Sequence, residues 1–240
     1  MSRNILCINL ETILYWTIET NTGGKIMAKV LILGANGKIA RLAEHILIDT
    51  TDSDLRLFLR NAGRLRDFAD SHTLVEAVEG DATNVEDLQE SMKDVDVVYA
   101  NLAGDNIESE ARAVVKAMHA ENKTRLIWIS TLGIYNEVPG KFGEWNNKTL
   151  GSYITNYAAA AKVIEDSDLD YTIIRPAWLT DKPEVDYEVT QKGEDFKGTE
   201  VSRRSIAQVV VDITQDPDKF KRESIGINKP NTDGDKPAWY

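Results

Sequence analysis

Cysteine is nearly absent from this sequence of 240 residues, in which Cys7 stands alone. A single thiol excludes an internal disulfide and a metal site built from several thiolates, and such sparse use fits a reducing, cytoplasmic compartment. The three histidines, His45, His72 and His119, share no spacing typical of metal ligands. The sequence therefore predicts no metal site.

Long apolar runs and an excess of positive charge are also lacking. The apolar stretch at residues 5–18 is interrupted by polar residues and followed by no small-residue cleavage site, which predicts neither a secretory signal nor a membrane-spanning helix. With 39 acidic and 28 basic residues the net charge is -11, which argues against nucleic-acid binding. Screening over about 8 Å still lets a few local arginines hold a small phosphate ligand.

The remaining composition is that of an ordinary globular domain, with 42% hydrophobic and 28% charged residues. The length supports one substantial core, and neither an internal repeat nor a linker divides it. A polar run at 21–25 precedes Met27, which opens a typical Met-Ala-Lys start. We therefore expect an N-terminal extension over 1–26 outside the core, a single domain over 27–230 and a polar, loosely held tail over 231–240.

Short β-rich segments alternate with amphipathic segments from residue 27 onward. Val30-Leu31-Ile32-Leu33 is typical of a strand buried on both faces, and further strands are expected at 54–59, 74–79, 95–100, 125–130, 171–174, 185–189 and 199–201. Helices are expected at 39–47, 63–70, 85–92, 109–121, 154–166 and 202–212, and a Gly- and Asn-rich loop at 139–148. The alternation predicts an α/β fold, a Rossmann-type doubly wound parallel sheet with a small C-terminal elaboration on the substrate side.

A glycine turn stands where the first strand gives way to the first helix, in Gly34-Ala35-Asn36-Gly37-Lys38-Ile39-Ala40. A backbone that approaches a pyrophosphate closely has no room for side chains, and the free amides at a helix N-terminus favour an anion. The spacing also suits any tight strand-to-helix turn, but its place after the first strand favours phosphate binding. The predicted pyrophosphate ligands are Gly34, Asn36, Gly37, Lys38 and Ile39.

The second strand ends in Arg60 rather than in an acidic residue. Asp52 and Asp54 lie at the distance expected for a ribose-binding carboxylate but precede the strand, at the wrong end of the sheet. A guanidinium at Arg60 suits a 2′-phosphate, which favours NADP(H) over NAD(H); the alternative is a solvated surface charge. Asp81, after the third strand, would meet the adenine amino group or cap the next turn, and the sequence leaves both open.

Six motifs follow one another in an order typical of one family: Leu31-Ile32-Leu33-Gly34-Ala35-Asn36-Gly37, Leu59-Arg60-Asn61, Glu79-Gly80-Asp81-Ala82, Asp94-Val95-Asp96-Val97-Val98, Ile129-Ser130-Thr131-Leu132-Gly133 and Asp170-Tyr171-Thr172-Ile173-Ile174-Arg175-Pro176. The chain thus resembles the atypical short-chain dehydrogenases/reductases of the NmrA-like, NAD(P)-binding subgroup. The resemblance implies that Asp81 and Ala82 bind the cofactor. It places Asn101, Leu102, Ala103 and Ser130 near the nicotinamide, with Pro176 against the carboxamide side.

Members of that family that oxidise alcohols use a Tyr-x-x-x-Lys pair, which this chain lacks. Tyr153 is followed four residues later by Tyr157, and Lys162 lies one residue too far from Tyr157 to take the lysine's place. A phenol without a cationic partner is a poor base at neutral pH. Tyr153 remains a catalytic candidate, with simple packing as the alternative. Ser130 and Thr131 are candidates too, since their hydroxyls would donate to a carbonyl acceptor or satisfy nearby backbone.

Hydride transfer to an acceptor that needs little proton chemistry stays compatible with these residues. Tyr135, Phe142, Trp145 and Trp178 would line a pocket for a flat ring; the alternative is that Phe142 and Trp145 only anchor the loop 139–148. We therefore expect an NAD(P)H-dependent oxidoreductase acting on a small quinone, flavin-like or carbonyl acceptor. The alternatives are a non-catalytic, redox-sensing NADP(H)-binding regulator and, less favoured, a nucleotide-sugar epimerase. The expected partner is a small-molecule substrate, neither nucleic acid nor membrane, and the amphipathic stretch 109–121 is compatible with a homo-oligomer.

Overall fold

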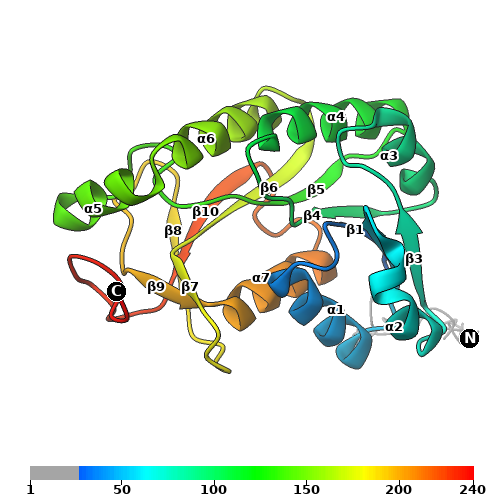
Figure 1. Ribbon diagram of the computed structural model, residues 1–240, viewed down its shortest axis with the longest axis horizontal. Coiled ribbons are helices and arrows are strands. Elements are labelled where there is room, and N and C mark those ends of the chain that lie inside the picture. The colour runs from blue at the N-terminus through cyan, green and yellow to red at the C-terminus, as the bar shows by residue number, and fades with distance from the viewer. Residues whose placement is uncertain (1–26) are drawn as a thin grey trace, which may run out of the picture.

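A computed structural model describes residues 27–240, so the expected extension over 1–26 lies outside the described residues. These form a sheet of eight strands between two layers of helices (Figure 1). In spatial order the strands are β3 (Val75–Glu79), β2 (Asp54–Leu59), β1 (Lys29–Leu33), β4 (Val97–Ala100), β5 (Arg125–Ile129), β6 (Asp170–Pro176), β10 (Glu223–Asn228) and β8 (Glu188–Gln191). Every neighbouring pair is parallel except β10 and β8. The predicted α/β, Rossmann-type sheet is confirmed.

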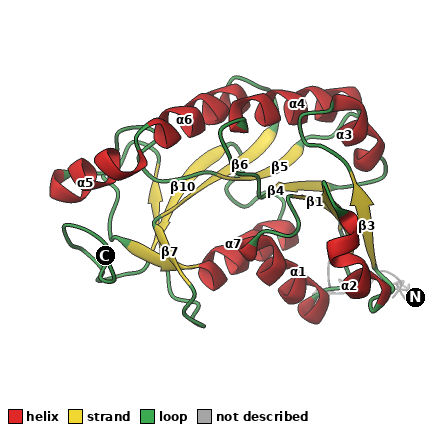
Figure 2. Cartoon of the chain, viewed as in Figure 1, coloured by secondary structure: helices red, strands yellow, loops and turns green. Residues whose placement is uncertain are grey.

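Helices cover both faces of the sheet, as Figures 1 and 2 show. One face carries α1 (Lys38–Thr50), the short η1 (Ala62–Leu65), α2 (Arg66–Asp70) and α7 (Arg203–Gln215); the other carries α3 (Val85–Met92), α4 (Ile107–Ala120) and α6 (Ser152–Glu165), which α5 (Gly140–Leu150) precedes. The side chains of β1 contribute to two hydrophobic cores, one on each face of the sheet. Val30 and Ile32 belong to the cluster under α1 and α7, whereas Leu31 and Leu33 belong to the cluster under α4 and α6. The alternation of side chains along a strand thus requires apolar residues at every position from Val30 to Leu33.

The order of the strands reverses beside β1. The chain proceeds from β1 outward to β2 and β3, then returns to place β4 on the opposite side of β1. The connections after β1 and β4 therefore leave the sheet toward opposite faces, and a crevice opens between them at the carboxyl ends of the strands. The glycine turn follows β1 and Asn101 follows β4, so both meet at this crevice.

A small second sheet extends the same edge beyond β6. It pairs β7 (Trp178–Thr180) in parallel with β9 (Glu200–Ser202), next to the start of α7. The predicted cap of α7 is confirmed, because the Ser202 hydroxyl accepts a hydrogen bond from the Ser205 amide at 2.9 Å. This sheet is the C-terminal elaboration expected from the sequence. The strand predicted at 185–189 begins later, as β8, and belongs to the main sheet.

Three segments differ from the expectation. Residues 139–148, expected as a loop, lie in the helix α5, because burial of Phe142 and Asn146 on one face outweighs the low helix propensity of Gly and Asn. A Cβ at Gly143 would lie 2.0 Å from the Val138 carbonyl oxygen, so glycine permits a close approach there. The strand β10 was not expected, since its position depends on pairing with β6 and β8. The expected helix at 63–70 is also divided, into η1 and α2.

A carboxyl group is buried within the core face of α1. Glu44 is fully inaccessible to solvent, and only one of its oxygens, Oε2, has a partner, the Arg41 guanidinium. Burial outweighs the attraction of Arg41 and raises the pKa of Glu44 from 4.5 to about 8. The carboxyl group is therefore protonated in the folded protein at neutral pH.

Replacing Glu44 with Gln is expected to alter how stability depends on pH. Because the folded pKa is raised, the contribution of Glu44 to the free energy of unfolding is fully present below pH 4.5 and is lost as pH rises to about 8. Relative to wild type, Glu44→Gln should therefore gain stability with rising pH, by up to about 1.4 kcal/mol per unit. Urea unfolding at several pH values measures the difference. Glu108→Gln, in an exposed pair with Arg112, is the control; a constant difference for Glu44→Gln would contradict the prediction.

A buried ion pair fixes the loop that follows β5. Arg175 of β6 is fully buried and donates to Glu137 Oε1, to Ser224 Oγ at 3.1 Å and to the Ser224 carbonyl at 3.2 Å. Glu137 in turn accepts the backbone amides of Gly133 at 3.1 Å and Tyr135 at 2.9 Å. The pair therefore joins β6 and β10 to the turn that begins at the end of β5.

Removing the carboxylate of this pair should destabilise the fold. Glu137→Gln leaves the Arg175 guanidinium buried without its counter-charge, which is expected to lower the free energy of unfolding by about 3–5 kcal/mol. Chemical denaturation measures the loss. Asp166→Asn breaks the exposed pair with Lys162 and should cost at most about 1 kcal/mol. Equal losses in the two variants would show that burial of the pair is energetically unimportant.

Candidate functional site

The glycine turn brings the β1–α1 connection against the β4–α4 loop. Gly34 has a φ of +73°, and a Cβ there would lie 2.5 Å from the Asn101 carbonyl oxygen. A Cβ at Gly37 would lie 2.0 Å from Asn101 Nδ2. Both glycines are thus required by close approach within the protein itself, which leaves the turn free of side-chain bulk on the crevice side.

The N-terminus of α1 is built to receive an anion. Gly37 is the N-cap, and within residues 27–240 no side chain caps the helix by a hydrogen bond. The first amides of a helix lack intrahelical partners and carry its positive dipole end, so a pyrophosphate fits there. Lys38 is exposed beside this turn, whereas the Ile39 side chain is buried in the core. Ile39 could therefore contribute only its backbone amide.

A first cavity of about 450 Å³ lies at the carboxyl ends of β1, β2, β3 and β4. It gathers eight of the predicted cofactor residues, from four separate connections of the sheet. The lining residues are Gly34, Asn36, Phe58, Leu59, Arg60, Asn61, Arg64, Gly80, Asp81, Ala82, Asn101, Leu102, Ala103, Asn106 and Glu110.

Arginines and a carboxylate face one another in this first cavity. Arg60, just after β2, and Arg64, in η1, are exposed in its wall. Asp81 accepts hydrogen bonds from the Thr83 amide and hydroxyl, each at 2.8 Å, which lowers the pKa of Asp81. The capping role that the sequence left open for Asp81 is therefore present, and its ionised carboxylate also lines the cavity. Contact with an adenine amino group remains a prediction.

Glu110 was missed by the sequence reasoning. It lies on the buried face of α4, where Oε1 accepts from Asn106 Nδ2 at 3.2 Å and Oε2 has no hydrogen-bond partner. Burial raises the pKa of Glu110. A signal existed, because an acidic residue interrupts the apolar stripe formed by Ile107, Ala111 and Val114.

A second cavity, of about 390 Å³, lies at the carboxyl ends of β5 and β6. It brings together the three catalytic candidates, Ser130, Thr131 and Tyr153, with Pro176. The resemblance placed Asn101, Leu102 and Ala103 at this end, but they line the first cavity. The second cavity is lined by Ser130, Thr131, Leu132, Leu150, Tyr153, Pro176, Ala177, Trp178, Leu179, Arg203 and Trp239.

Ser130 lines the second cavity, and its buried hydroxyl has no partner among residues 27–240. The residue is only 6% exposed, and its amide donates to the Ile174 carbonyl at 2.7 Å, which holds it at the end of β5. Its Oγ makes no hydrogen bond within the described chain. The alternative expected for a strand-end hydroxyl, bonding to nearby backbone, is therefore not realised. An unsatisfied buried hydroxyl at a cavity wall is suited to a ligand's oxygen.

The two tyrosines of α6 bond to each other rather than to a lysine. Their hydroxyl oxygens lie 2.6 Å apart and their rings stack with centroids 4.1 Å apart. Lys162 is exposed and pairs with Asp166. Burial raises the pKa of both Tyr153 and Tyr157. Neither phenol is ionised near neutral pH, and Tyr153 donates its hydroxyl proton in a hydrogen bond to Tyr157, so Tyr153 is a poor base.

Only one of the four aromatic residues expected to line a ring pocket does so. Trp178 lines the second cavity, whereas Phe142 and Trp145 stack on each other behind it. The Tyr135 hydroxyl instead bonds Glu165 at 2.6 Å, away from the cavity. Trp239, which is half exposed, was missed and supplies another aromatic wall. Tyr240 packs against Trp145 and Trp178, although most residues of the tail over 231–240 are exposed.

Two other kinds of site were sought along the chain. Over residues 27–240, no helix combines the length and the apolar character needed to cross a bilayer. Within the same range, no group of three or more His, Cys, Asp or Glu side chains is arranged to hold a metal ion. The crevice with its two cavities is the candidate functional site.

Comparison with known proteins agrees with this geometry. A Rossmann-fold NAD(P)-binding family protein from Shigella flexneri is 40% identical, with 88% of this chain and 98% of that chain covered and a TM-score of 0.75. A short-chain dehydrogenase/reductase of the wide type from Veillonella parvula DSM 2008, crystallised with NADP, is 32% identical, with 88% and 100% covered and a TM-score of 0.82.

A curated relative adds a different activity. It is described as an uncharacterized sugar epimerase, YhfK, from Bacillus subtilis (strain 168), and is 26% identical over 196 residues, which cover 76% of this chain and 86% of that protein.

The NAD(P)H-binding family model matches residues 34–217, from the glycine turn to the end of α7. With the glycine turn, the uncapped helix and the crevice in place, the chain belongs to the NAD(P)H-binding family.

Proposed function

We propose that this protein is an NADPH-dependent oxidoreductase that reduces a small carbonyl, quinone or flavin-like acceptor bound in the second cavity. The observation that carries the proposal is the unpartnered Ser130 hydroxyl, buried at the end of β5 in the wall of that cavity. It lies beside a protonated phenol, Tyr153, and opposite apolar walls that suit a flat ring.

The first cavity supports the proposed cofactor. The uncapped N-terminus of α1 would hold the pyrophosphate, and Arg60 with Arg64 would hold the 2′-phosphate through charge-assisted hydrogen bonds. Similarity to the Veillonella parvula protein crystallised with NADP is consistent with this preference. When bound, the dinucleotide supplies the hydride.

The chain's own residues then act on the acceptor oxygen. Ser130 donates a hydrogen bond to that oxygen and stabilises the negative charge that develops as the acceptor is reduced. Tyr153 keeps its proton at neutral pH but donates it to the Tyr157 hydroxyl, so it would serve as a second donor only by turning its O–H from Tyr157 to the acceptor. Leu132, Leu150 and Trp178 limit water around the acceptor. These roles require a protonated phenol and suit reduction better than alcohol oxidation.

An epimerase is the second candidate, because the Bacillus subtilis relative carries that description. Epimerisation requires a base that removes a proton, and Tyr153 faces Tyr157 where a lysine would be needed to lower its pKa. The oxidoreductase therefore remains the better supported function. A redox-sensing regulator would bind NADPH without turnover, so an absence of NADPH oxidation across quinone, flavin and carbonyl acceptors would favour it.

Arg60→Ala should abolish most of the discrimination between NADPH and NADH. Losing charge-assisted hydrogen bonds to the 2′-phosphate is expected to raise the Kd for NADPH by about 10- to 100-fold and to leave that for NADH unchanged. Calorimetric titration with each dinucleotide measures both constants. Arg66→Ala, an exposed arginine outside the first cavity, is the matched control. Selectivity that persists in Arg60→Ala would refute this role.

Ser130→Ala should impair turnover without weakening cofactor binding. Removing the one buried donor at the acceptor oxygen is expected to lower kcat/KM by about 100- to 1000-fold. Steady-state oxidation of NADPH with a quinone acceptor measures the loss, and titration with NADPH checks that its Kd is retained. Ser71→Ala, an exposed serine between α2 and β3, should behave as wild type. Unimpaired turnover in Ser130→Ala would remove the main support for the mechanism.

A further inference from the structure

The second cavity contains a cation that the proposed reaction does not use. Arg203, the first residue of α7, lines the cavity with 21% of its side chain exposed. Its Nη1 donates to Asp181 Oδ1 at 2.7 Å and to the Leu179 carbonyl at 3.5 Å. Within residues 27–240, Nε and Nη2 make no hydrogen bond, so a planar guanidinium with several free donors borders the cavity.

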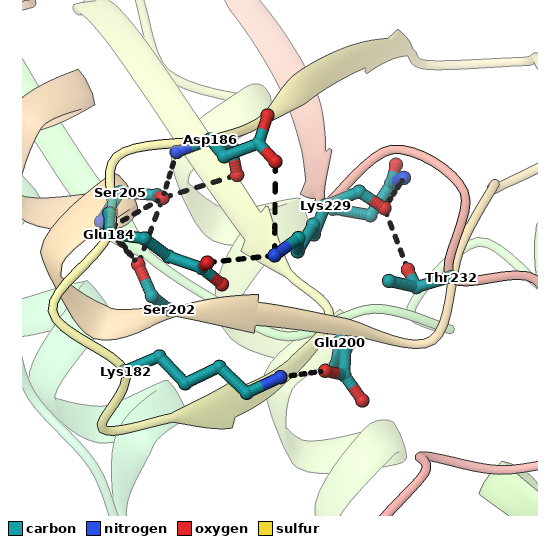
Figure 3. A network of polar contacts seen from close by, with 9 residues as sticks. Lys182, Glu184, Asp186, Glu200, Ser202, Ser205, Lys229 and Thr232 are labelled. Atoms are coloured by element: carbon teal, nitrogen blue, oxygen red, sulfur yellow. Dashed lines mark hydrogen bonds and ion pairs between the residues drawn. The ribbon is translucent and has the colours of Figure 1, made fainter.

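The backbone around Arg203 is held in place by a network of polar contacts (Figure 3). Ser202 Oγ caps α7 and donates to the Glu184 carbonyl at 2.6 Å. The Glu184 carboxylate accepts from Lys229 Nζ at 2.7 Å. The backbone of Arg203 is therefore fixed, because hydrogen bonds join Ser202 to the segment that contains Asp181 and Glu184.

The same network positions Trp239, an aromatic residue in the wall of the second cavity. Glu200, which is buried, accepts from Lys182 Nζ at 3.0 Å and from the Ala238 amide at 3.3 Å. The second of these bonds places Trp239 at the cavity. Arg203 and Trp239 are thus set by one scaffold, on the side of the cavity formed by β7, β9 and the tail.

The ion pair with Asp181 leaves other hydrogen-bond donors of the Arg203 guanidinium unused. Asp181 is 65% exposed and is shared with Lys38 of the glycine turn, whose Nζ lies 3.3 Å away. An ion pair so open to water contributes little, and Nε and Nη2 remain available beside it. Because the whole chain carries a net charge of -11, an anionic substrate would be repelled unless a local cation received it.

We propose that the second cavity selects flat, conjugated acceptors that carry a carboxylate, which Arg203 binds while Ser130 binds the acceptor's carbonyl oxygen. Trp178, Trp239 and Leu150 supply apolar walls for the body of such a molecule. This inference rests on the proposed function for the hydride-accepting end. It adds a recognition group for the opposite end of the substrate.

The test compares a propyl-substituted naphthoquinone with the same quinone bearing a propanoate chain, both with NADPH. The two acceptors differ in charge but hardly in the reactive ring, so wild-type enzyme should show a lower KM for the propanoate. Arg203→Gln should raise that KM by about 10- to 100-fold and leave kcat and the KM for the neutral quinone unchanged. Arg203→Lys should show an intermediate effect, since it keeps the charge but loses the fork.

Two further variants separate recognition from scaffolding. Arg204→Gln changes the exposed neighbouring arginine, which does not line the cavity, and should leave both KM values as in wild type. Asp181→Asn removes the competing carboxylate and should lower the KM for the propanoate. If Arg203 served only to hold Asp181, the variants Asp181→Asn and Arg203→Gln would act alike, and the proposal would be overturned. Equal KM values for both quinones in wild type would also overturn it.

A binding measurement distinguishes this inference from the proposed function. Quenching of tryptophan fluorescence by each quinone, without turnover, reports on the cavity that Trp178 and Trp239 line. Tighter binding of the propanoate in wild type but not in Arg203→Gln would support the carboxylate site even if neither quinone were reduced. In that case the oxidoreductase function alone would fail. Equal binding of the two quinones would refute the carboxylate site.

Discussion

The reversal of strand order beside β1 is the constraint on which the site depends. Because β2 and β4 lie on opposite sides of β1, the connections after β1 and β4 diverge and leave a crevice at the carboxyl edge. Gly34 and Gly37 let the first connection approach Asn101 in the second, so the crevice stays narrow at its base. The uncapped end of α1 then points its amides toward a place that suits a diphosphate.

Two cavities with different linings lie along this edge of the sheet. The first is bordered by the exposed arginines Arg60 and Arg64 together with the carboxyl groups of Asp81 and Glu110, which suits a charged and hydrogen-bonding nucleotide. The second has aromatic and aliphatic walls as well as polar side chains, and among the described residues Ser130 supplies its buried, unpartnered hydroxyl. Local cations matter in both, because the overall charge of the chain is negative and screening confines each charge to its neighbourhood.

Much of this could be predicted from the sequence. Continuous apolar character in β1 indicated a strand buried on both faces, and its alternation with amphipathic helices predicted the doubly wound sheet. The NAD(P)-binding resemblance is confirmed by the family match, whereas membership of the NmrA-like subgroup and the preference for NADP remain predictions. The lack of a lysine partner for the tyrosines could also be predicted, because the sequence spacing of Tyr157 and Lys162 fixes their relative positions on one helix.

The sequence by itself determined the parts that local chemistry decides: the periodicity of strands and helices, the glycine turn, and a tyrosine without a lysine. Tertiary structure alone decided which distant segments share a cavity. Trp239 and Arg203 reach Ser130 only because β7, β9 and the tail fold back beside β6, and no local pattern encodes that approach. The helix α5 and the strand β10 likewise owe their form to contacts made across the fold, where burial and pairing outweigh intrinsic propensity.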